Sequence, residues 1–258
     1  MTEEFTDFEY WERRGETYEE LDDIRSKRTA YRIVNMIKLL GLNRGSWILD
    51  AGCGGGDITK VVRDNFRHSN VLGIDLSNRM IGGAKIKQVP GLKFFGTDFF
   101  HFVEGMGISF FDLIMMSLFI HHLTDDRDKK AVELVYKTLK PKGHILIAEA
   151  IPPEDSVFDH YSEIFKLKET RNCYTLSDLL KLVRGGGFVD LKFMTYRFDI
   201  RLKSWLNDST LSPEKKKLIY SMHTNASDEF KKAYAMRPLL RGDYRLRCKM
   251  AIVTGKKS

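Results

Sequence analysis

The sequence predicts an α/β fold: a Rossmann-like, mostly parallel sheet of seven strands with helices on both faces, an antiparallel last strand and a helical cap. Two observations lead to this class. Apolar segments that suit strands alternate with segments of helical periodicity through residues 47–150, a pattern typical of parallel sheets joined by right-handed crossovers. A glycine-rich stretch, 52–56, also separates the first strand from the next helix, and such junctions are typical of nucleotide-binding sites.

The expected strands are short and are separated by turns or helices. The fourth, FDLIMMS, is almost continuously apolar, as expected for a strand that is buried on both faces. A Pro-Lys-Gly turn precedes the fifth strand. In chain order, the seven strands are expected at 47–50, 71–75, 92–96, 111–117, 144–150, 188–197 and 248–255.

Helices are expected between these strands and before the first one. Residues 26–40 show apolar side chains at helical spacing, and Gly41 ends the pattern. Thr175 followed by Asp178 resembles a capping box at the start of another helix. The expected helices are 8–23, 26–40, 57–66, 78–87, 126–139, 154–170 and 175–184.

The 258 residues suit a single domain with two additions. Residues 1–40 are expected to form an N-terminal helical lid. About 50 residues, 198–247, separate the last two strands, which is too long for a plain loop in a compact domain. We expect this segment to be a helical insertion that acts as a cap beside the site.

Composition indicates an ordered cytoplasmic protein without a membrane span. No apolar run is long enough to cross a bilayer, and the acidic N-terminus does not resemble a signal peptide. The three cysteines, Cys53, Cys173 and Cys248, stand far apart, which fits a reducing compartment. Charge is uneven: residues 1–24 hold ten acids and two arginines, whereas 199–258 hold fourteen basic and six acidic residues.

The glycine-rich junction has the form acid-x-Gly-x-Gly-x-Gly, with Asp50, Gly52, Gly54 and Gly56 at the four positions. Asp57 stands where the dinucleotide fingerprint requires its last glycine, and its carboxylate would repel a pyrophosphate. No Gly-Lys-Ser/Thr follows, which excludes a P-loop. The junction resembles motif I of the class I S-adenosylmethionine (SAM) dependent methyltransferases.

This resemblance extends over residues 30–197 through the segments LDAGCGGG, GIDLS, SLFIHHLTD and LKPKGHILIAE. Within the superfamily these segments are most similar to the small-molecule methyltransferases of ubiquinone and menaquinone biosynthesis. The resemblance implies SAM as cofactor and S-adenosylhomocysteine as product. It also implies that cofactor-binding residues lie at the ends of the strands: Asp50, Gly52, Cys53, Gly54, Gly56, Asp75, Leu76, Met80, Asp98, Phe99 and Ser117.

Individual roles follow from the chemistry of these side chains. Asp75 has two oxygens that can accept both ribose hydroxyls. Met80 would pack on the adenine, while Asp98 and Phe99 would meet its amino group and ring. Asp50 is tolerable near a cationic sulfonium.

The candidate catalytic residues are His121 and His122, which follow the fourth strand and are expected near the methyl group. A neutral histidine suits the removal of an acceptor proton. Glu149 and His223 are further base candidates. No metal site is expected, because adjacent histidines should point in different directions. An aromatic lid is expected from Tyr10, Trp11 and Tyr18.

The sequence therefore predicts methyl transfer to a small organic acceptor, at oxygen or carbon, by a monomer or homodimer. Two alternatives stay open. The basic C-terminal part fits an RNA-modifying methyltransferase, for example one that acts on a wobble uridine of tRNA, although no RNA-binding module is recognisable. A non-catalytic SAM-binding partner protein would keep the glycine loop without needing a base.

Overall fold

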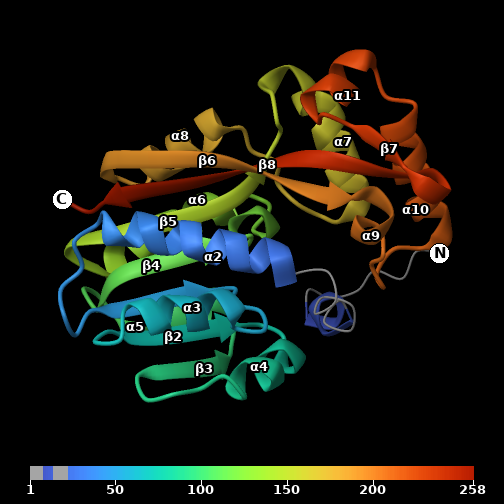
Figure 1. The fold of residues 1–258 in the computed structure, drawn as a ribbon. Helices are drawn as coiled ribbons and strands as arrows, with labels where there is room; N and C mark the ends of the chain where they lie inside the picture. Colours follow the sequence, from blue (N-terminus) through green and yellow to red (C-terminus); the bar gives the residue numbers. More distant parts are fainter. Residues whose placement is uncertain (1–7, 14–22) are drawn as a thin grey trace.

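A computed structural model describes residues 8–13 and 23–258, and it shows one twisted sheet with helices on both faces (Figure 1). The strand order is β3-β2-β1-β4-β5-β8-β6, and the short β7 pairs with β8 outside this path. The strands are β1 (Trp47–Ala51), β2 (Asn70–Asp75), β3 (Leu92–Gly96), β4 (Phe111–Ser117), β5 (Leu139–Ile151), β6 (Val189–Arg201), β7 (Arg237–Leu239) and β8 (Asp243–Lys256).

Pairing is parallel from β3 through β2, β1 and β4 to β5. The last strand, β8, lies antiparallel between β5 and β6. The predicted α/β class, with its mostly parallel sheet and antiparallel last strand, is confirmed. The carboxyl ends of β1, β2, β4 and β5 meet at one edge, where open α/β sheets bind their ligands.

Two sets of helices bury the two faces of the sheet in separate apolar clusters. Helices α2 (Asp23–Lys38), α3 (Asp57–Asn65) and α4 (Asn78–Lys85) cover one face. Helices α5 (Phe99–Met106), α6 (Arg127–Thr138) and α8 (Leu176–Gly185) cover the other. Alternate residues of β4 enter the two clusters, as the apolar run of this strand predicted.

A third apolar cluster lies beyond the ends of β6 and β8 and belongs to a segment group that we name the cap. The cap comprises α7 (Phe158–Lys168), α9 (Leu202–Trp205), α10 (Pro213–Thr224) and α11 (Asp228–Ala233). In Figure 1 it stands beside the carboxyl edge of the parallel strands. The tertiary arrangement therefore brings the cap to the edge where a site is expected.

Several boundaries differ from those expected. Strands β6 and β8 both run further toward the cap, so the segment between them covers 202–242. They extend because they pair with each other along their whole length, from Val189 with Lys256 to Arg201 with Arg245. Helix α5 was not anticipated; it starts directly after Asp98, whose side chain accepts a hydrogen bond from the backbone N–H of His101.

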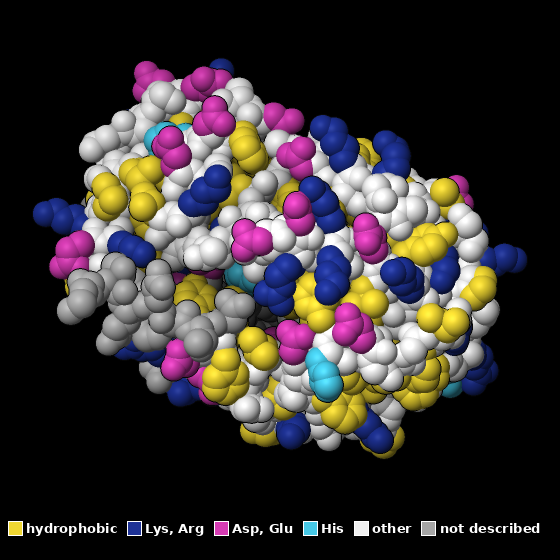
Figure 2. Space-filling view, turned by 180° about the vertical axis from the view of Figure 1, so that it is seen from behind, with side chains coloured by type: hydrophobic (Ala, Val, Ile, Leu, Met, Phe, Trp, Pro, Cys, Tyr) yellow, Lys and Arg dark blue, Asp and Glu magenta, His cyan; other side chains and the backbone are white. Residues whose placement is uncertain are grey.

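The surface mixes charges of both signs. On the face shown in Figure 2, Lys and Arg side chains lie among Asp and Glu side chains rather than in one field. Among the described residues, no helix has the length and apolar character to cross a membrane.

The capping box of α8 provides a test of the local structure. Thr175 accepts the N–H of Asp178, and the Asp178 carboxylate accepts the N–H of Thr175. Thr175→Ala should lower the free energy of unfolding by about 1 kcal/mol, because one helix-end donor loses its partner. Ser177→Ala, on the exposed side of the same turn, should have little effect. Equal losses in urea denaturation would contradict the capping role.

Candidate active site

A cavity of about 1020 Å³ opens at the carboxyl edge of the parallel strands. One half is lined by the loops after β1, β2, β3 and β4. The other half is lined by the segments after β4 and β5, by the cap and by the N-terminal helix at 8–13. Its size lies at the upper end for ligand pockets and leaves room for two molecules side by side.

The glycine loop forms the floor of the first half. Gly52, Gly54 and Gly56 all have positive φ angles, of 70°, 51° and 78°, which side chains other than glycine adopt at a cost. A Cβ on Gly52 would stand 2.4 Å from the ring of Phe119, and one on Gly56 would stand 2.7 Å from the ring of Phe94. A Cβ on Gly54 would meet nothing within 4 Å. Gly54 is therefore where a ligand can approach the bare backbone.

Asp75 ties this loop to the end of β2. Its Oδ2 accepts the N–H of Gly54 at 2.8 Å, and its Oδ1 accepts the N–H of Ser77 at 3.0 Å. Burial raises the pKa of the Asp75 carboxyl, although these backbone donors oppose the shift. The carboxylate lines the cavity and retains lone pairs for a ligand's hydroxyls.

Three of the predicted cofactor residues do not line the cavity: Asp50 in β1, and Cys53 and Gly56 within the glycine loop itself. Asp50 Oδ2 accepts the hydroxyl of Thr59 at 2.6 Å, which links β1 to α3. Complete burial raises the pKa of Asp50 to about 7, and the nearby Asp75 adds to the shift. The Cys53 thiol is buried, and burial raises its pKa as well.

The other predicted residues of this half do line the cavity: Gly52, Gly54, Asp75, Leu76, Met80, Asp98, Phe99 and Ser117. They come from four different loops, so the strand order brings them together. Asp98 also caps α5, and Ser77, next to Leu76, caps α4 by accepting the N–H of Met80. Helix capping and cavity lining therefore share the same short segments.

The turn after β4 is strained, and it positions the histidine pair. Leu118 has a φ of 53°, which is unfavourable for leucine, and its N–H is fixed by the carbonyl of Ala148 on β5. A single 3₁₀ turn, η1 (Ile120–His122), follows. His121 is buried, and its Nδ1 lies 2.7 Å from Oε2 of Glu149 at the end of β5. Complete burial raises the pKa of Glu149 to about 7, and the nearby Arg171 opposes this shift.

The two histidine rings lie together, with centroids 3.8 Å apart, so the expectation that they point in different directions was wrong. A 3₁₀ turn separates neighbouring side chains by about 120° about its axis, so the contact between the rings is set by the rotation of the two side chains and not by the turn alone. Both rings line the cavity. The His122 ring also meets Trp11 of the N-terminal helix edge-on at 4.4 Å.

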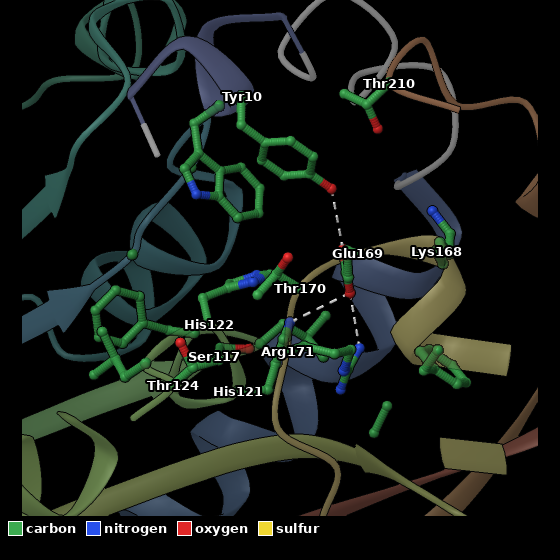
Figure 3. Close-up of a pocket in the computed structure, with 18 of the residues that line it drawn as sticks. Tyr10, Ser117, His121, His122, Thr124, Lys168, Glu169, Thr170, Arg171 and Thr210 are labelled. Carbon is green, nitrogen blue, oxygen red and sulfur yellow. Dashed lines mark hydrogen bonds and ion pairs between the residues drawn. The ribbon is translucent and has the colours of Figure 1, made fainter. Parts of the chain in front are cut away.

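Glu169 and Arg171, which the sequence analysis did not single out, face this pair from the segment after α7 (Figure 3). Oε1 of Glu169 lies 3.7 Å from Nε2 of His121 and accepts a hydrogen bond from Nη1 of Arg171 at 2.9 Å. Tyr10 donates its hydroxyl to the other oxygen of Glu169 at 3.5 Å. A charged run, Lys168 to Arg171, is the only signal in the sequence, and it does not reveal a partner 48 residues away.

The N-terminal helix, residues 8–13, is anchored at the first half of the cavity. Glu12 accepts the hydroxyl of Ser77 at 2.8 Å and the N–H of Arg79 at 3.1 Å at the start of α4. A carboxylate is favourable at this end of a helix. Tyr10 and Trp11 line the cavity as expected of a lid, whereas Tyr18 lies outside the described residues.

His223 does not belong to this site. It is buried in α10, where its Nδ1 faces the carbonyl oxygen of Ile219 at 2.8 Å. Burial lowers its pKa to about 4, and its ring packs against Trp205 and Phe230. Its surroundings are those of a core residue in the cap.

Comparison with known proteins defines the class of this site. A family model described as a methyltransferase domain matches residues 48–143, which span the glycine loop and β1 to β4. An uncharacterised methyltransferase of Synechocystis is 29% identical over 166 residues, 61% of this chain and 73% of that protein. A carboxy-S-adenosyl-L-methionine synthase of Wolinella succinogenes is 24% identical over 197 residues, 66% and 77% of the two chains.

The crystal structure of the YcgJ protein from Bacillus subtilis has the same fold, with a TM-score of 0.73 at 21% identity, covering 88% of this chain and 98% of that one. Fold, glycine loop and family match together define a methyltransferase. These findings support a class I SAM-dependent methyltransferase with SAM as its cofactor. The narrower resemblance to ubiquinone and menaquinone enzymes stays a prediction.

The expected ribose contact of Asp75 leads to a binding test. Asp75→Asn should weaken S-adenosylhomocysteine binding by about tenfold or more, because the ligand and the Gly54 N–H lose a charged acceptor. Asp64→Asn, an exposed carboxylate of α3 paired with Lys60, is the matched control. Titration calorimetry measures both, and equal affinities would contradict the role of Asp75.

The raised pKa of Asp50 predicts a pH dependence of stability. Between about pH 4 and 7 the unfolded chain has this carboxyl ionised, whereas the folded chain keeps it protonated. The folded state then binds more protons, so this group makes stability fall as pH rises through that window, by about 1.4 kcal/mol per unit of pKa difference. Asp50→Asn should flatten the decline in melting temperature from pH 5 to 8. An unchanged slope in that variant would contradict the assignment.

Proposed function

We propose that the protein transfers the methyl group of SAM to a small organic acceptor, at oxygen or carbon. The observation that carries this proposal is the single cavity that joins the glycine loop to the histidine pair beneath the lid and the cap. Enclosure of this kind suits a small molecule, because an in-line displacement requires the acceptor to be held against the methyl group.

The donor half would hold the cofactor through the residues predicted from the sequence. Gly52 and Gly54 would offer bare backbone, and Asp75 would accept the ribose hydroxyls. Met80 and Phe99 would enclose the adenine ring, with Asp98 at its amino group, while Leu76 and Ser117 would complete the wall. Asp50 would support this half by joining β1 to α3 through Thr59, while Cys53 and Gly56 belong to the loop without lining the cavity.

The acceptor half would use His121 and His122 to promote loss of the acceptor's proton. Oxygen and carbon nucleophiles both have to lose one proton when they gain a methyl group. Either a free imidazole or a cation held by imidazoles promotes such a loss. Glu149, in contact with His121, is a positioning residue for this pair.

The main alternative to a small-molecule acceptor is RNA, and the basic residues in 199–258 favour it. Acidic residues lie among the basic ones on the face shown in Figure 2, and Arg245 and Arg247 pair with Asp199. A surface of this kind offers less attraction to a phosphate backbone than its net charge implies.

We also propose a reducing, cytoplasmic location, since the three cysteines are free thiols.

The proposed function is tested with SAM that carries a deuterated methyl group. Purified protein, labelled SAM and a fractionated cell extract are incubated, and the small-molecule, RNA and protein fractions are analysed by mass spectrometry. The label is expected in a small molecule. Gly54→Trp, which places a large side chain in the open space above the loop, should abolish the transfer.

Each contrary outcome of this experiment would support a different function for the protein. Label in RNA, with binding that is lost steeply as salt rises, would establish the RNA-modifying alternative. SAM binding without transfer to any fraction would establish a non-catalytic partner protein. Consumption of SAM with the label retained on a modified cofactor would indicate chemistry like that named for the Wolinella relative.

A further inference from the structure

Three side chains with metal-binding atoms converge at the boundary between the two halves of the cavity. His121 and His122 come from η1, and Glu169 comes from the segment after α7. Their nitrogen and oxygen atoms all lie within 4.8 Å of one another. His121 and Glu169 are buried, and His122 is half-buried. All three line the cavity, and Figure 3 shows them approaching from two sides.

The spacing of these atoms fits a shared ion better than direct hydrogen bonding. Nε2 of His121 and Oε1 of Glu169 are 3.7 Å apart, which is beyond hydrogen-bond length. Two ligands that bind one zinc ion at 2.0–2.2 Å with tetrahedral geometry place their atoms about 3.4 Å apart. Closing by a few tenths of an ångström would bring this pair to that spacing, whereas the ligand atoms of the whole set, which lie within 4.8 Å of one another, would close by up to about 1.4 Å.

Each buried ligand is also held from behind by a second group. His121 presents Nδ1 to Glu149 at 2.7 Å, which leaves Nε2 directed toward Glu169. Glu169 is held by Arg171 at 2.9 Å and by the hydroxyl of Tyr10 at 3.5 Å. Carboxylate partners behind ligating histidines and hydrogen bonds to ligating carboxylates are typical of metal sites.

The hydrogen bonding of this cluster is incomplete without a further group. Within the described part of the chain, Oε1 of Glu149 and Nη2 of Arg171 are buried without a hydrogen-bond partner. A cation with bound water would supply further hydrogen-bonding atoms beside these groups.

We propose that His121, His122 and Glu169 bind one divalent transition-metal ion, and that Zn²⁺ is the ion this donor set suits best. Three protein ligands with open positions toward a cavity are the arrangement of a catalytic zinc site. The site replaces our expectation that the histidines hold no metal. Its role in activating the acceptor rests on the function proposed above.

An ion held by His121, His122 and Glu169 would favour an acceptor that binds through oxygen, because it would stabilise the oxygen anion that remains when the acceptor's O–H loses its proton. That proton would pass to solvent. The oxygen then forms its bond to the methyl carbon while the C–S bond breaks, and the electron pair goes to sulfur. One proton is released overall for each methyl transferred. The preferred substrate class is thus a hydroxyl or enol compound.

The test measures metal binding directly, on full-length protein freed of its affinity tag and dialysed against a chelator. Zn²⁺ is titrated by calorimetry with saturating S-adenosylhomocysteine, and Co²⁺ serves as a spectroscopic probe of coordination. We expect one ion per chain. Glu169→Gln and His122→Ala should each weaken binding by at least about tenfold, because losing even a hydrogen-bond partner of a metal ligand can cost that much affinity.

Matched controls are His101→Ala and Glu104→Gln, both exposed on α5 and outside the cavity, and these should bind Zn²⁺ as the parent does. Absence of stoichiometric Zn²⁺ binding to the parent protein would overturn the proposal, as would equal affinity in both cluster variants. Circular dichroism shows whether each variant folds. Where a variant does not fold, Zn²⁺ binding to the parent protein decides the test.

Activity separates this proposal from the one on which it rests. Full methyl transfer by protein verified to be free of metal would overturn the metal's role and leave the proposed function intact. Absence of methyl transfer in protein that binds both SAM and Zn²⁺ would instead count against the proposed function. Rescue of chelated protein by Zn²⁺, with none in Glu169→Gln, would support both.

Discussion

The parallel order of β2, β1, β4 and β5 is the constraint on which the site depends. It places four loops at one edge of the sheet, on both sides of the point where the strand order reverses between β1 and β4. Asp75 then ties the β1 loop to the end of β2 through the N–H of Gly54. The carbonyl of Ala148 fixes the turn after β4 through Leu118. Without this strand order, the glycine loop and the histidine pair would not face the same cavity.

The buried charges around His121 are difficult to explain by stability alone. Moving ions out of water costs several kcal/mol each, and well-packed apolar residues of similar volume often stabilise a fold as well or better. Here Glu149, Glu169 and Arg171 are all buried beside a histidine, and a second buried ion pair, Lys168 with Asp208, lies next to them. Because burying these charges costs so much desolvation free energy, a cluster of them at the wall of a cavity is better explained by chemistry performed there.

The sequence predicted the donor half far better than the acceptor half, for a physical reason. Strand periodicity and the residues that end each strand are local, so Asp75, Asp98 and Ser117 could be placed at one edge from the alternation of elements alone. Glu169 and Trp205 reach the cavity only through the packing of the cap, which depends on contacts between distant segments. The histidine pair follows a turn in which Leu118 has a φ of 53°, and local sequence patterns do not predict a positive φ at a leucine.

The different construction of the two halves of the cavity has a consequence for the choice of methyl acceptor. The donor half is built from turns whose backbone angles are constrained, as at Gly52 and Gly56, where a single Cβ would collide with Phe119 or Phe94. The acceptor half is lined by the N-terminal helix and by the cap, and the apolar side chains of the cap pack in a cluster of their own. Substitutions there can change the acceptor without disturbing the glycine loop. The N-terminal helix at 8–13 is the exception, because Glu12 joins it to the start of α4. Cofactor binding in the donor half can therefore shift Tyr10 and Trp11. Such a shift would move their contact partners, Glu169 and His122.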